Sequence, residues 1–358
     1  QLTPEQTFTN PASVMLWVFV VLAMLGVIAG NIRSIALMTL VTVLIPEDRR
    51  DRANGLVGTT LGVSFLVTSV ISGLLVAAGA MFYVLILAMT VLALSVVHLA
   101  FVRVEDRPEG AVAPDVESVD LQPKRSNVDL RGTLRVVRGV PGLLALIAFS
   151  CFNNFLGGAF MALMDAYGLY LVSVQTWGLL WGALSAFFII GGLAVAKTGL
   201  GKNPVRLLLL VNLAFWTVTC LFPLRSSVIL LAAGMAIYML LGPYAEASEQ
   251  TILQKVVPYE RQGRVFGFAQ SVELAASPLT AFLIGPITQL IFIPFMTTGA
   301  GVELIGGWFG TGPDRGIALV FMLTGLLGLA VTILALFSRP YRQLSTRYTG
   351  EPEPVLAG

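Results

Sequence analysis

The residues of this sequence that could do chemistry are ionisable side chains inside long apolar segments. Glu246, Glu249 and Glu273 lie within such segments, and so does Arg33. A charged group at bilayer depth costs on the order of a few kcal/mol unless it is paired or hydrated, so each is a candidate functional group. Carboxyl groups placed there can take up and release protons, as coupling to a proton gradient requires.

Two of these acids share one helical face with an amide. Glu246, Glu249 and Gln250 are spaced i, i+3 and i+4. Two acids this close in a medium of low dielectric constant are expected to hold at least one proton near neutral pH. Glu249 is nearer to the end of its segment, so the alternative of a solvated mouth residue stays open. Glu273, with Gln270 on the same face, is the second candidate for proton binding.

The composition indicates what surrounds these groups. The chain has 358 residues, of which 56% are hydrophobic and 12% charged, with a mean hydropathy of +0.85. Soluble domains carry about 25% charged residues and cannot hide so much apolar surface from water. We therefore expect a polytopic membrane protein, which excludes a soluble enzyme, a disordered chain and a disulfide-bonded scaffold. The net charge of +2 and the single histidine predict neither nucleic-acid binding nor a metal site, and we expect no cofactor.

Nine apolar segments are long enough to cross a bilayer, which takes roughly 20 residues each. Weak β periodicity argues against a transmembrane barrel, so the predicted fold is all-α. The segments are approximately Ser13–Ile45, Leu56–Ala78, Met81–Val102, Gly142–Val172, Trp177–Ala196, Val205–Phe222, Val228–Leu253, Val265–Phe292 and Gly316–Phe337.

Positive charge predicts the orientation of these segments. Nearly all of the 22 Lys and Arg residues lie in alternate connections. Only Arg225 and Arg315 lie in the others, and Arg33 lies within a segment. Because cytoplasmic loops are enriched in Lys and Arg, we expect the N-terminus of this chain outside and the C-terminus in the cytoplasm.

Two connections are long. The polar stretch 104–140 separates an N-terminal unit (1–103) from a C-terminal unit (141–338), which a cytoplasmic tail (339–358) follows. Its end, Asn127–Arg138, is expected either to form a short amphipathic helix on an anionic inner leaflet or to remain a solvated linker. The Gly-rich outer loop Thr297–Asp314 is expected to be an exposed connector.

An internal repeat relates the two units. Ile45–Gly55 and Val257–Gly267 share a Pro, an acid, two Arg positions and a Gly at an offset of 212 residues. Each copy joins two apolar segments across a cytoplasmic loop, which is typical of parallel repeats. In the second unit three segments precede the one that leads into the repeated loop, whereas in the first unit none does. We therefore expect about 70 further residues, forming three helices, at the front of a twelve-helix protein in two six-helix halves.

Both loop copies resemble those of the major facilitator superfamily, in particular of its drug–proton antiporter branch, which includes macrolide and siderophore exporters. The resemblance covers essentially the whole chain, read as helices four to twelve of that fold. Two positions depart from the branch: Ala196 stands where an acid is typical, and Thr68-Ser69 where Gly-Pro is frequent. The resemblance implies two pseudo-symmetric helical bundles around a central cavity and a function in transport.

The repeat also relates Arg33 to Glu246. Applied to Ser34, the neighbour of Arg33, the offset of 212 gives Glu246. In the resembled fold both helices line the cavity, so we predict an ion pair that forms across it or alternates there. The alternative is a local structural pair of Arg33 with the backbone or Asn31.

Further polar residues lie on the segment Gly142–Val172. Asn154 and Asp165 belong to a stripe of polar and small residues that suits a water-lined cavity, with Asp165 near its outer mouth. Asn153 and Asn154 are expected either to contact substrate or to join helices by hydrogen bonds. Aromatic and Met residues of the second unit are candidates for a pliable apolar pocket, or else for lipid contact.

Charged residues of the two repeated loops are candidates for a cytoplasmic gate. They stand at equivalent helix ends, where ion pairs could form in the outward-open state and break when the inside opens. The alternative is that they only enforce topology. The candidates are Asp48, Arg49 and Arg52 in the first copy and Glu260, Arg261 and Arg264 in the second.

The sequence thus predicts a secondary transporter in the plasma membrane of a bacterium. The leading hypothesis is proton-coupled (or Na⁺-coupled) efflux of amphipathic small molecules by alternating access in a monomer, with the lipid bilayer as its surroundings. An uptake permease for a specific solute and an inactive truncated transporter are the alternatives. An integral-membrane enzyme is disfavoured, because neither a nucleophile–base set nor a metal motif is present.

Overall fold

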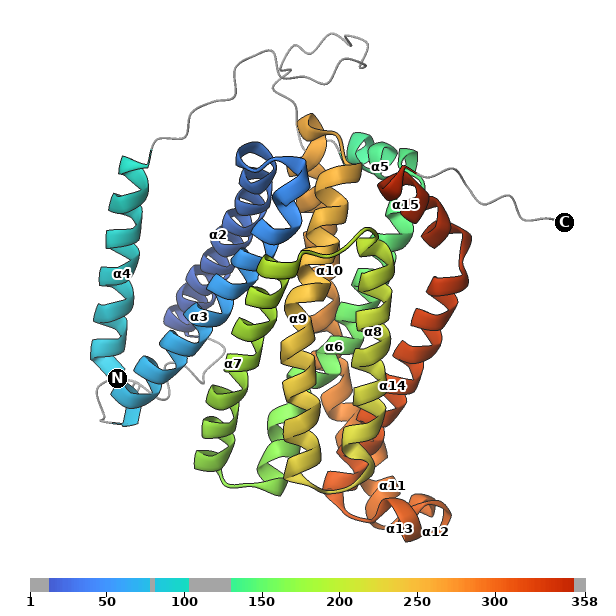
Figure 1. Ribbon diagram of the computed structural model, residues 1–358. Helices are drawn as coiled ribbons and strands as arrows, with labels where there is room; N and C mark the ends of the chain where they lie inside the picture. Colours follow the sequence, from blue (N-terminus) through green and yellow to red (C-terminus); the bar gives the residue numbers. More distant parts are fainter. Residues whose placement is uncertain (1–12, 78–80, 103–129, 351–358) are drawn as a thin grey trace, which may run out of the picture.

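The computed structural model describes residues 13–77, 81–102 and 130–350, which contain helices and no strand (Figure 1). Each of the nine predicted apolar segments coincides with one long helix. These helices are α2 (Val14–Leu44), α3 (Arg50–Ala77), α4 (Met81–Phe101), α6 (Leu143–Leu171), α7 (Val174–Thr198), α8 (Pro204–Leu221), α9 (Val228–Val256), α10 (Tyr259–Ile287) and α14 (Pro313–Phe337).

Within the described part of the chain, eight helices are long and apolar enough to cross a membrane. Large apolar side chains point outward along them: Phe101 and Phe282, for example, are 81% and 79% exposed. In a bilayer such side chains contact lipid, and the helices satisfy their own backbone hydrogen bonds. The prediction of an all-α polytopic membrane fold is confirmed.

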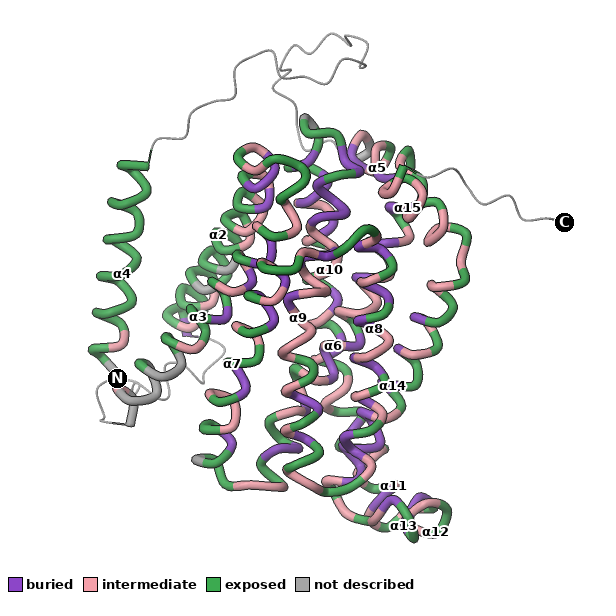
Figure 2. The backbone as a smooth tube through the Cα atoms, viewed as in Figure 1, coloured by how far each residue is buried: buried purple, intermediate pink, exposed green. Residues whose placement is uncertain are grey.

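The helices form two groups that meet along one seam. The N-terminal group comprises α2, α3 and α4, and the C-terminal group comprises α6 to α10 with α14 (Figure 1). α3 packs along α7, and α2 contacts α9 and α10. α4 packs only weakly, against α3, and is exposed along almost its whole length (Figure 2).

Glycines make the seam between α3 and α7 close. A Cβ atom added at Gly55 would lie 2.6 Å from the backbone nitrogen of Ala196, and one at Gly192 would lie 2.6 Å from that of Thr59. Small residues let helix backbones approach closely in membranes, where dispersion contacts rather than hydrophobic burial drive association. The two groups are therefore in tight contact along this seam.

The repeated loops have the same local structure. α2 ends at Leu44 and α9 at Val256, and in each copy the Pro residue precedes the next helical turn. The fourth residue after each Pro donates to the carbonyl groups five and eight positions before it. Arg50 binds Ile45 O and Thr42 O at 3.3 and 3.1 Å, and Gln262 binds the equivalent Val257 O and Gln254 O at 3.1 and 3.0 Å. The side chains satisfy carbonyls that the helix ends leave unpaired.

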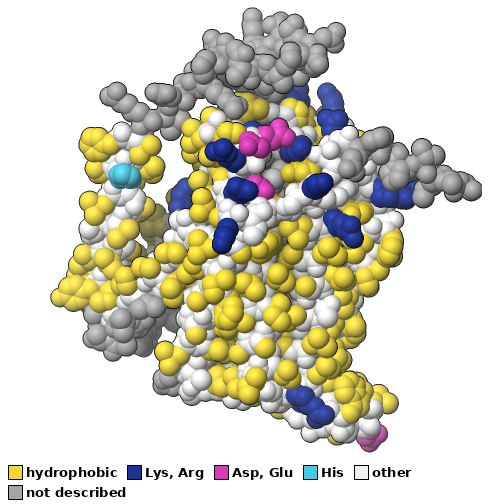
Figure 3. Space-filling view, in the orientation of Figure 1, with side chains coloured by type: hydrophobic (Ala, Val, Ile, Leu, Met, Phe, Trp, Pro, Cys, Tyr) yellow, Lys and Arg dark blue, Asp and Glu magenta, His cyan; other side chains and the backbone are white. Residues whose placement is uncertain are grey.

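Two short helices lie at the basic end of the molecule. Figure 3 shows Lys and Arg side chains gathered at the end that carries α5 (Leu130–Gly139) and α15 (Arg339–Thr349). The predicted amphipathic helix is thus present from Leu130, and its earlier residues lie outside the described part. Its apolar face is covered by protein, because Val137 is fully buried in a cluster with Leu344 of α15.

The opposite end contains more structure than the sequence suggested. The expected exposed connector Thr297–Asp314 is instead built from α12 (Ala300–Leu304) and α13 (Gly306–Phe309), which follow α11 (Ile293–Thr297). Met296 and Phe309 are buried there. Arg315, only 3% exposed, donates to the carbonyl groups of Pro223 and Leu224 and stacks on Phe309. The connector is exposed in part, as expected, but the prediction missed that its isolated apolar residues find partners in the tertiary structure.

Candidate functional site

Three carboxyl groups of the C-terminal group share one cavity of about 170 Å³. Glu246 and Glu249 enter it from α9, and Glu273 enters it from α10. The Gln250 amide donates to Glu246 at 3.3 Å, in keeping with the predicted shared helical face. The structure therefore brings together the three acids that the sequence singled out from two separate segments.

Two of these carboxyl groups, one on α9 and one on α10, meet in the cavity. Glu249 lies within hydrogen-bonding reach of the Glu273 carboxyl and of the Ser150 hydroxyl on α6. Glu273 Oε1 and Gln270 Oε1 are buried and have no hydrogen-bond partner among the described residues. Two carboxylates cannot hydrogen-bond to each other unless one carries a proton, so this arrangement suits a pair that holds one proton between them.

A larger cavity of about 500 Å³ adjoins the acidic one and shares Asn154, Glu246 and Glu249 with it. α6, α8 and α9 supply most of its polar lining. The indole N–H of Trp216 donates to Asn153 Oδ1 at 3.0 Å. Because an indole only donates, the amide oxygen of Asn153 must face it and the NH₂ group is left for a ligand.

Asn154 is oriented the other way. Its amide nitrogen donates to the carbonyl of Ser150 at 3.0 Å, which leaves its oxygen as an acceptor. Asn212 likewise donates to Leu208 O at 2.9 Å. The Asn153–Trp216 hydrogen bond joins α6 to α8, as one alternative predicted, whereas the bonds of Asn154 and Asn212 stay within their own helices. Contact of these amides with a substrate stays a prediction.

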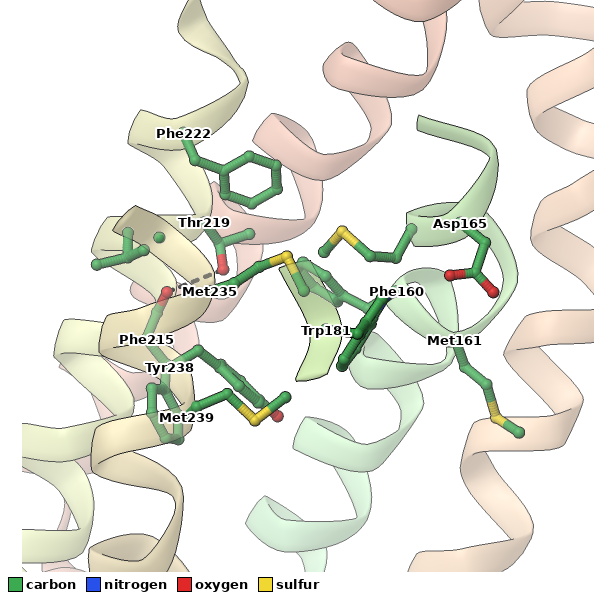
Figure 4. Close-up of a pocket in the computed structure, with 13 residues that line it drawn as sticks. Phe160, Met161, Asp165, Trp181, Phe215, Thr219, Phe222, Met235, Tyr238 and Met239 are labelled. Atoms are coloured by element: carbon green, nitrogen blue, oxygen red, sulfur yellow. Dashed lines mark hydrogen bonds between the residues drawn. The ribbon is translucent and has the colours of Figure 1, made fainter. Parts of the chain in front are cut away.

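A third cavity, of about 290 Å³, lies toward the end opposite the basic one and is lined by aromatic and Met side chains (Figure 4). It shares Phe160, Phe215, Thr219 and Tyr238 with the larger cavity, so the three cavities form one continuous series. Four thioethers line it, from Met161, Met164, Met235 and Met239. Unbranched Met side chains adapt their shape to different ligands.

Asp165 lies at the rim of this aromatic cavity. Its side chain is exposed and accepts a hydrogen bond from Trp177 Nε1 at 2.9 Å. The residues described along the three cavities include four carboxyl groups and neither Lys, Arg nor His. The series therefore has three carboxyl groups at one end and, at the other, an aromatic cavity with Asp165 at its rim.

Arg33 does not join the acidic cavity in this conformation. Its side chain is exposed on α2, and the ion pairs recorded among the described residues do not include one with Glu246. The offset of 212 correctly relates α2 to α9, but it does not specify which way a side chain points around the helix axis. An ion pair in another conformation stays a prediction.

The gate candidates whose side chains are described lie at the basic end, and the ion pairs found across the seam do not include them. Arg52, Arg261 and Arg264 are exposed, and Arg49 pairs with its neighbour Asp48 at 3.7 Å, both exposed. The side chain of Glu260 lies outside the described residues. In this conformation Asp48 and Arg49 form an ion pair at a helix terminus, and the ion pair that joins the two groups comes from the neighbouring Glu47.

Polar contacts that cross the seam at the basic end include those of Glu47, Asp51 and Asn54. Glu47 pairs with Lys255 at 3.2 Å, and Asp51 accepts from the backbone nitrogen of Leu200 at 3.0 Å. Asn54 donates to Thr251 at 2.8 Å and to the Gln254 side chain at 3.0 Å. The structure is therefore closed at its basic end.

Lys255 also contacts the tail helix. Its ammonium group lies 4.5 Å from the centre of the Tyr348 ring on α15. Burial, together with the nearby negative charges of Asp51 and Glu47, raises the pKa of Tyr348 to about 12. α15 is thus part of the closed end rather than a free tail.

Sequence reasoning missed the amides and hydroxyls that hold these sites. Asn54 stands within the repeated loop, and Gln254 follows Thr42 at the same offset of 212, so the repeat could have singled them out. Nothing in the sequence distinguishes Ser150 or Trp216 from other residues of apolar helices, because their roles depend on partners far along the chain.

Comparison with known proteins agrees with this architecture. The sequence profile of the Major Facilitator Superfamily matches residues 7–281, which is more than half of the chain. The chain belongs to the Major Facilitator Superfamily. This confirms the predicted superfamily and makes the protein a multi-pass membrane transporter, whose partners are a small-molecule substrate and the lipid bilayer. A comparison with the curated proteins finds no match.

Proposed function

We propose that this superfamily member is a proton-coupled exporter of amphipathic small molecules. The observation that carries the proposal is the continuity of the acidic cavity with the aromatic one through shared lining residues. An amphipathic ligand would place its apolar part among the aromatic and Met side chains and its polar part near Asn153 and Glu246. Ligand and proton would then compete for the same carboxyl groups, which links their movements.

Transport would proceed by alternating access between the two helix groups. The seam is closed at the basic end, where Glu47, Asp51 and Asn54 contact the C-terminal group. Separation of the groups at that end would break these contacts and expose the cavities to the other side. Protonation of the carboxyl pair would bias this equilibrium, because it changes the charge that the buried site must hold.

We further propose that the basic end faces the cytoplasm of a bacterium, with the chain in its plasma membrane. Lys and Arg gather around α5 and α15, and cytoplasmic surfaces of membrane proteins are enriched in these residues. The Tyr-, Phe- and Met-lined cavity then lies toward the outside. The seam would be closed on the cytoplasmic side, as in an outward-open state.

The test is dye accumulation in cells that lack their own efflux pumps. Cells with the protein should hold less of a fluorescent amphipathic dye, and a protonophore should abolish the difference. Glu246→Gln and Glu273→Gln should raise dye accumulation towards that of cells without the protein, because an amide, unlike a carboxyl group, does not ionise.

Glu303→Gln is the matched control, since Glu303 is an exposed acid of α12 outside the three cavities. Accumulation that responds equally to Glu303→Gln and Glu246→Gln would contradict the assignment of the carboxyl groups. The amides of Asn153, Asn154 and Asn212 would also suit a polar solute, so an uptake permease is the second candidate. Higher accumulation in the cells that contain the protein would favour it.

A further inference from the structure

The acidic cavity has one wall that comes from the N-terminal group. Every lining residue belongs to α6, α9 or α10 except Met38 of α2. Met38 is only 5% exposed and lies six residues before the end of α2 at Leu44. The compartment that holds Glu249 and Glu273 is therefore completed across the seam.

Two amides of the C-terminal group hold Met38 in this position. Gln254 donates to the backbone carbonyl of Met38 at 3.1 Å, and Gln270 donates to its sulfur at 3.8 Å. Gln270 stands one turn before Glu273 on α10 and lines the same cavity. The wall is thus fixed both by the helix that carries Glu249 and by the helix that carries Glu273.

Gln254 is itself held by the N-terminal group. Asn54 of α3 donates to its side chain at 3.0 Å, and Arg50 donates to its backbone carbonyl at 3.5 Å. Gln254 and Asn54 are 2% and 3% exposed. Hydrogen bonds in a buried site such as this are costly to break without replacement, so they couple the position of Met38 to closure of the whole basic end.

We propose that Met38 is a gate residue, which determines from which side of the membrane the Glu249–Glu273 pair is accessible. With the basic end closed, Met38 separates the pair from that end, and the acidic cavity communicates with the larger cavity through Asn154, Glu246 and Glu249. When the groups separate, Met38 leaves with α2 and the pair faces the basic end. The role of the pair in proton coupling rests on the proposed function, whereas the control of access by the Met38 gate can be measured independently of transport.

The experiment measures access to the cavity from each side of the membrane. Ala269, a small buried lining residue, is replaced by Cys in the full chain with Cys151 and Cys220 changed to Ser. Membrane vesicles of either orientation are treated with a positively charged methanethiosulfonate reagent. Met38→Ala should accelerate labelling from the basic side, whereas Met38→Leu, which keeps the volume, should stay near the parent rate.

Asn54→Leu is a second variant, which weakens the hydrogen bonds that hold the Met38 gate in place but leaves Met38 itself unchanged. It should raise labelling from the basic side about tenfold, as expected when the net contribution of a buried hydrogen bond is lost. Met24→Ala is the matched control, because Met24 is an exposed Met on the same helix.

Labelling from the basic side that is the same in Met38→Ala, Asn54→Leu and Met24→Ala would overturn the proposal. The measurement needs no substrate and no proton gradient. Faster labelling without any dye efflux would therefore support the Met38 gate and count against the exporter function. Dye efflux without faster labelling would support the exporter function and count against the Met38 gate.

Discussion

The close seam between α3 and α7 predicts that one added methyl group will shift the conformational equilibrium. In Gly55→Ala the new Cβ would lie 2.6 Å from Ala196 N and 2.7 Å from Val195 Cγ1, where ordinary contacts begin at 3.4 Å. The first of these neighbours is backbone and cannot rotate away. The two helices must therefore move apart by roughly the missing ångström.

Overpacking of this kind costs about 1–3 kcal/mol. The cost applies only to the conformation with the basic end closed, because the seam opens in the other. The ratio of closed to open molecules should then fall about 5- to 150-fold. The better helix propensity of Ala, about 1 kcal/mol, acts in both conformations and leaves the ratio unchanged.

The assay is a spin-label distance measurement between the two groups. Labels on Arg52→Cys and Lys197→Cys, both exposed at the basic end, report the separation of α3 from α7 in the background without Cys151 and Cys220. Gly55→Ala should add a population at longer distance.

Gly58→Ala is the control on the same helix, because its nearest neighbour would be Pro243 Cβ at an ordinary 3.5 Å. Identical distance distributions for Gly55→Ala and Gly58→Ala would refute the reasoning that the seam closes by backbone contact.

Three further outcomes follow from the same contacts. Arg315→Leu leaves the carbonyls of Pro223 and Leu224 unpaired and should lower thermal stability in detergent by about 1–3 kcal/mol, whereas Leu at the exposed Arg225 should not. The pKa of Tyr348 is raised from 10.0 to about 12, so docking of α15 is fully stabilised below pH 10 and weakens as pH rises through about 12. Ultraviolet titration of wild type and Tyr348→Phe should differ by one tyrosine that ionises near pH 12. A difference near pH 10 instead would contradict the docked position of the Tyr348 ring. Trp216→Phe removes the donor that orients Asn153, so it should weaken dye binding to the purified protein without lowering expression; unchanged binding would count against a ligand at that amide.

The fold could be read from the sequence to a large extent. Each long apolar segment became a helix, because a chain in lipid must satisfy its backbone hydrogen bonds locally and needs about 20 residues to cross. The repeat also predicted local structure, since Arg50 and Gln262 bind equivalent carbonyls. The segment 297–314 was predicted only in part, because Phe309 packs into a cluster with residues of other helices and against Arg315.

The site could be read only in part. Glu246, Glu249 and Glu273 were singled out because a carboxyl group is costly at bilayer depth wherever it lies. The proposed pairing of Arg33 was not found in this conformation, since helical offset fixes depth but leaves rotation about the axis undetermined.

By itself, the sequence determined the class of the protein, the course of its helices and the presence of acids within them, because these depend on hydropathy and local hydrogen bonding. Only the tertiary structure decided which carboxyl groups meet, which amide atom of Asn153 faces the cavity and which residues close the basic end. Those outcomes depend on helix rotation and on contacts between residues some 200 positions apart, such as Asn54 with Gln254. No local pattern records such contacts, since they are selected by packing of the whole bundle.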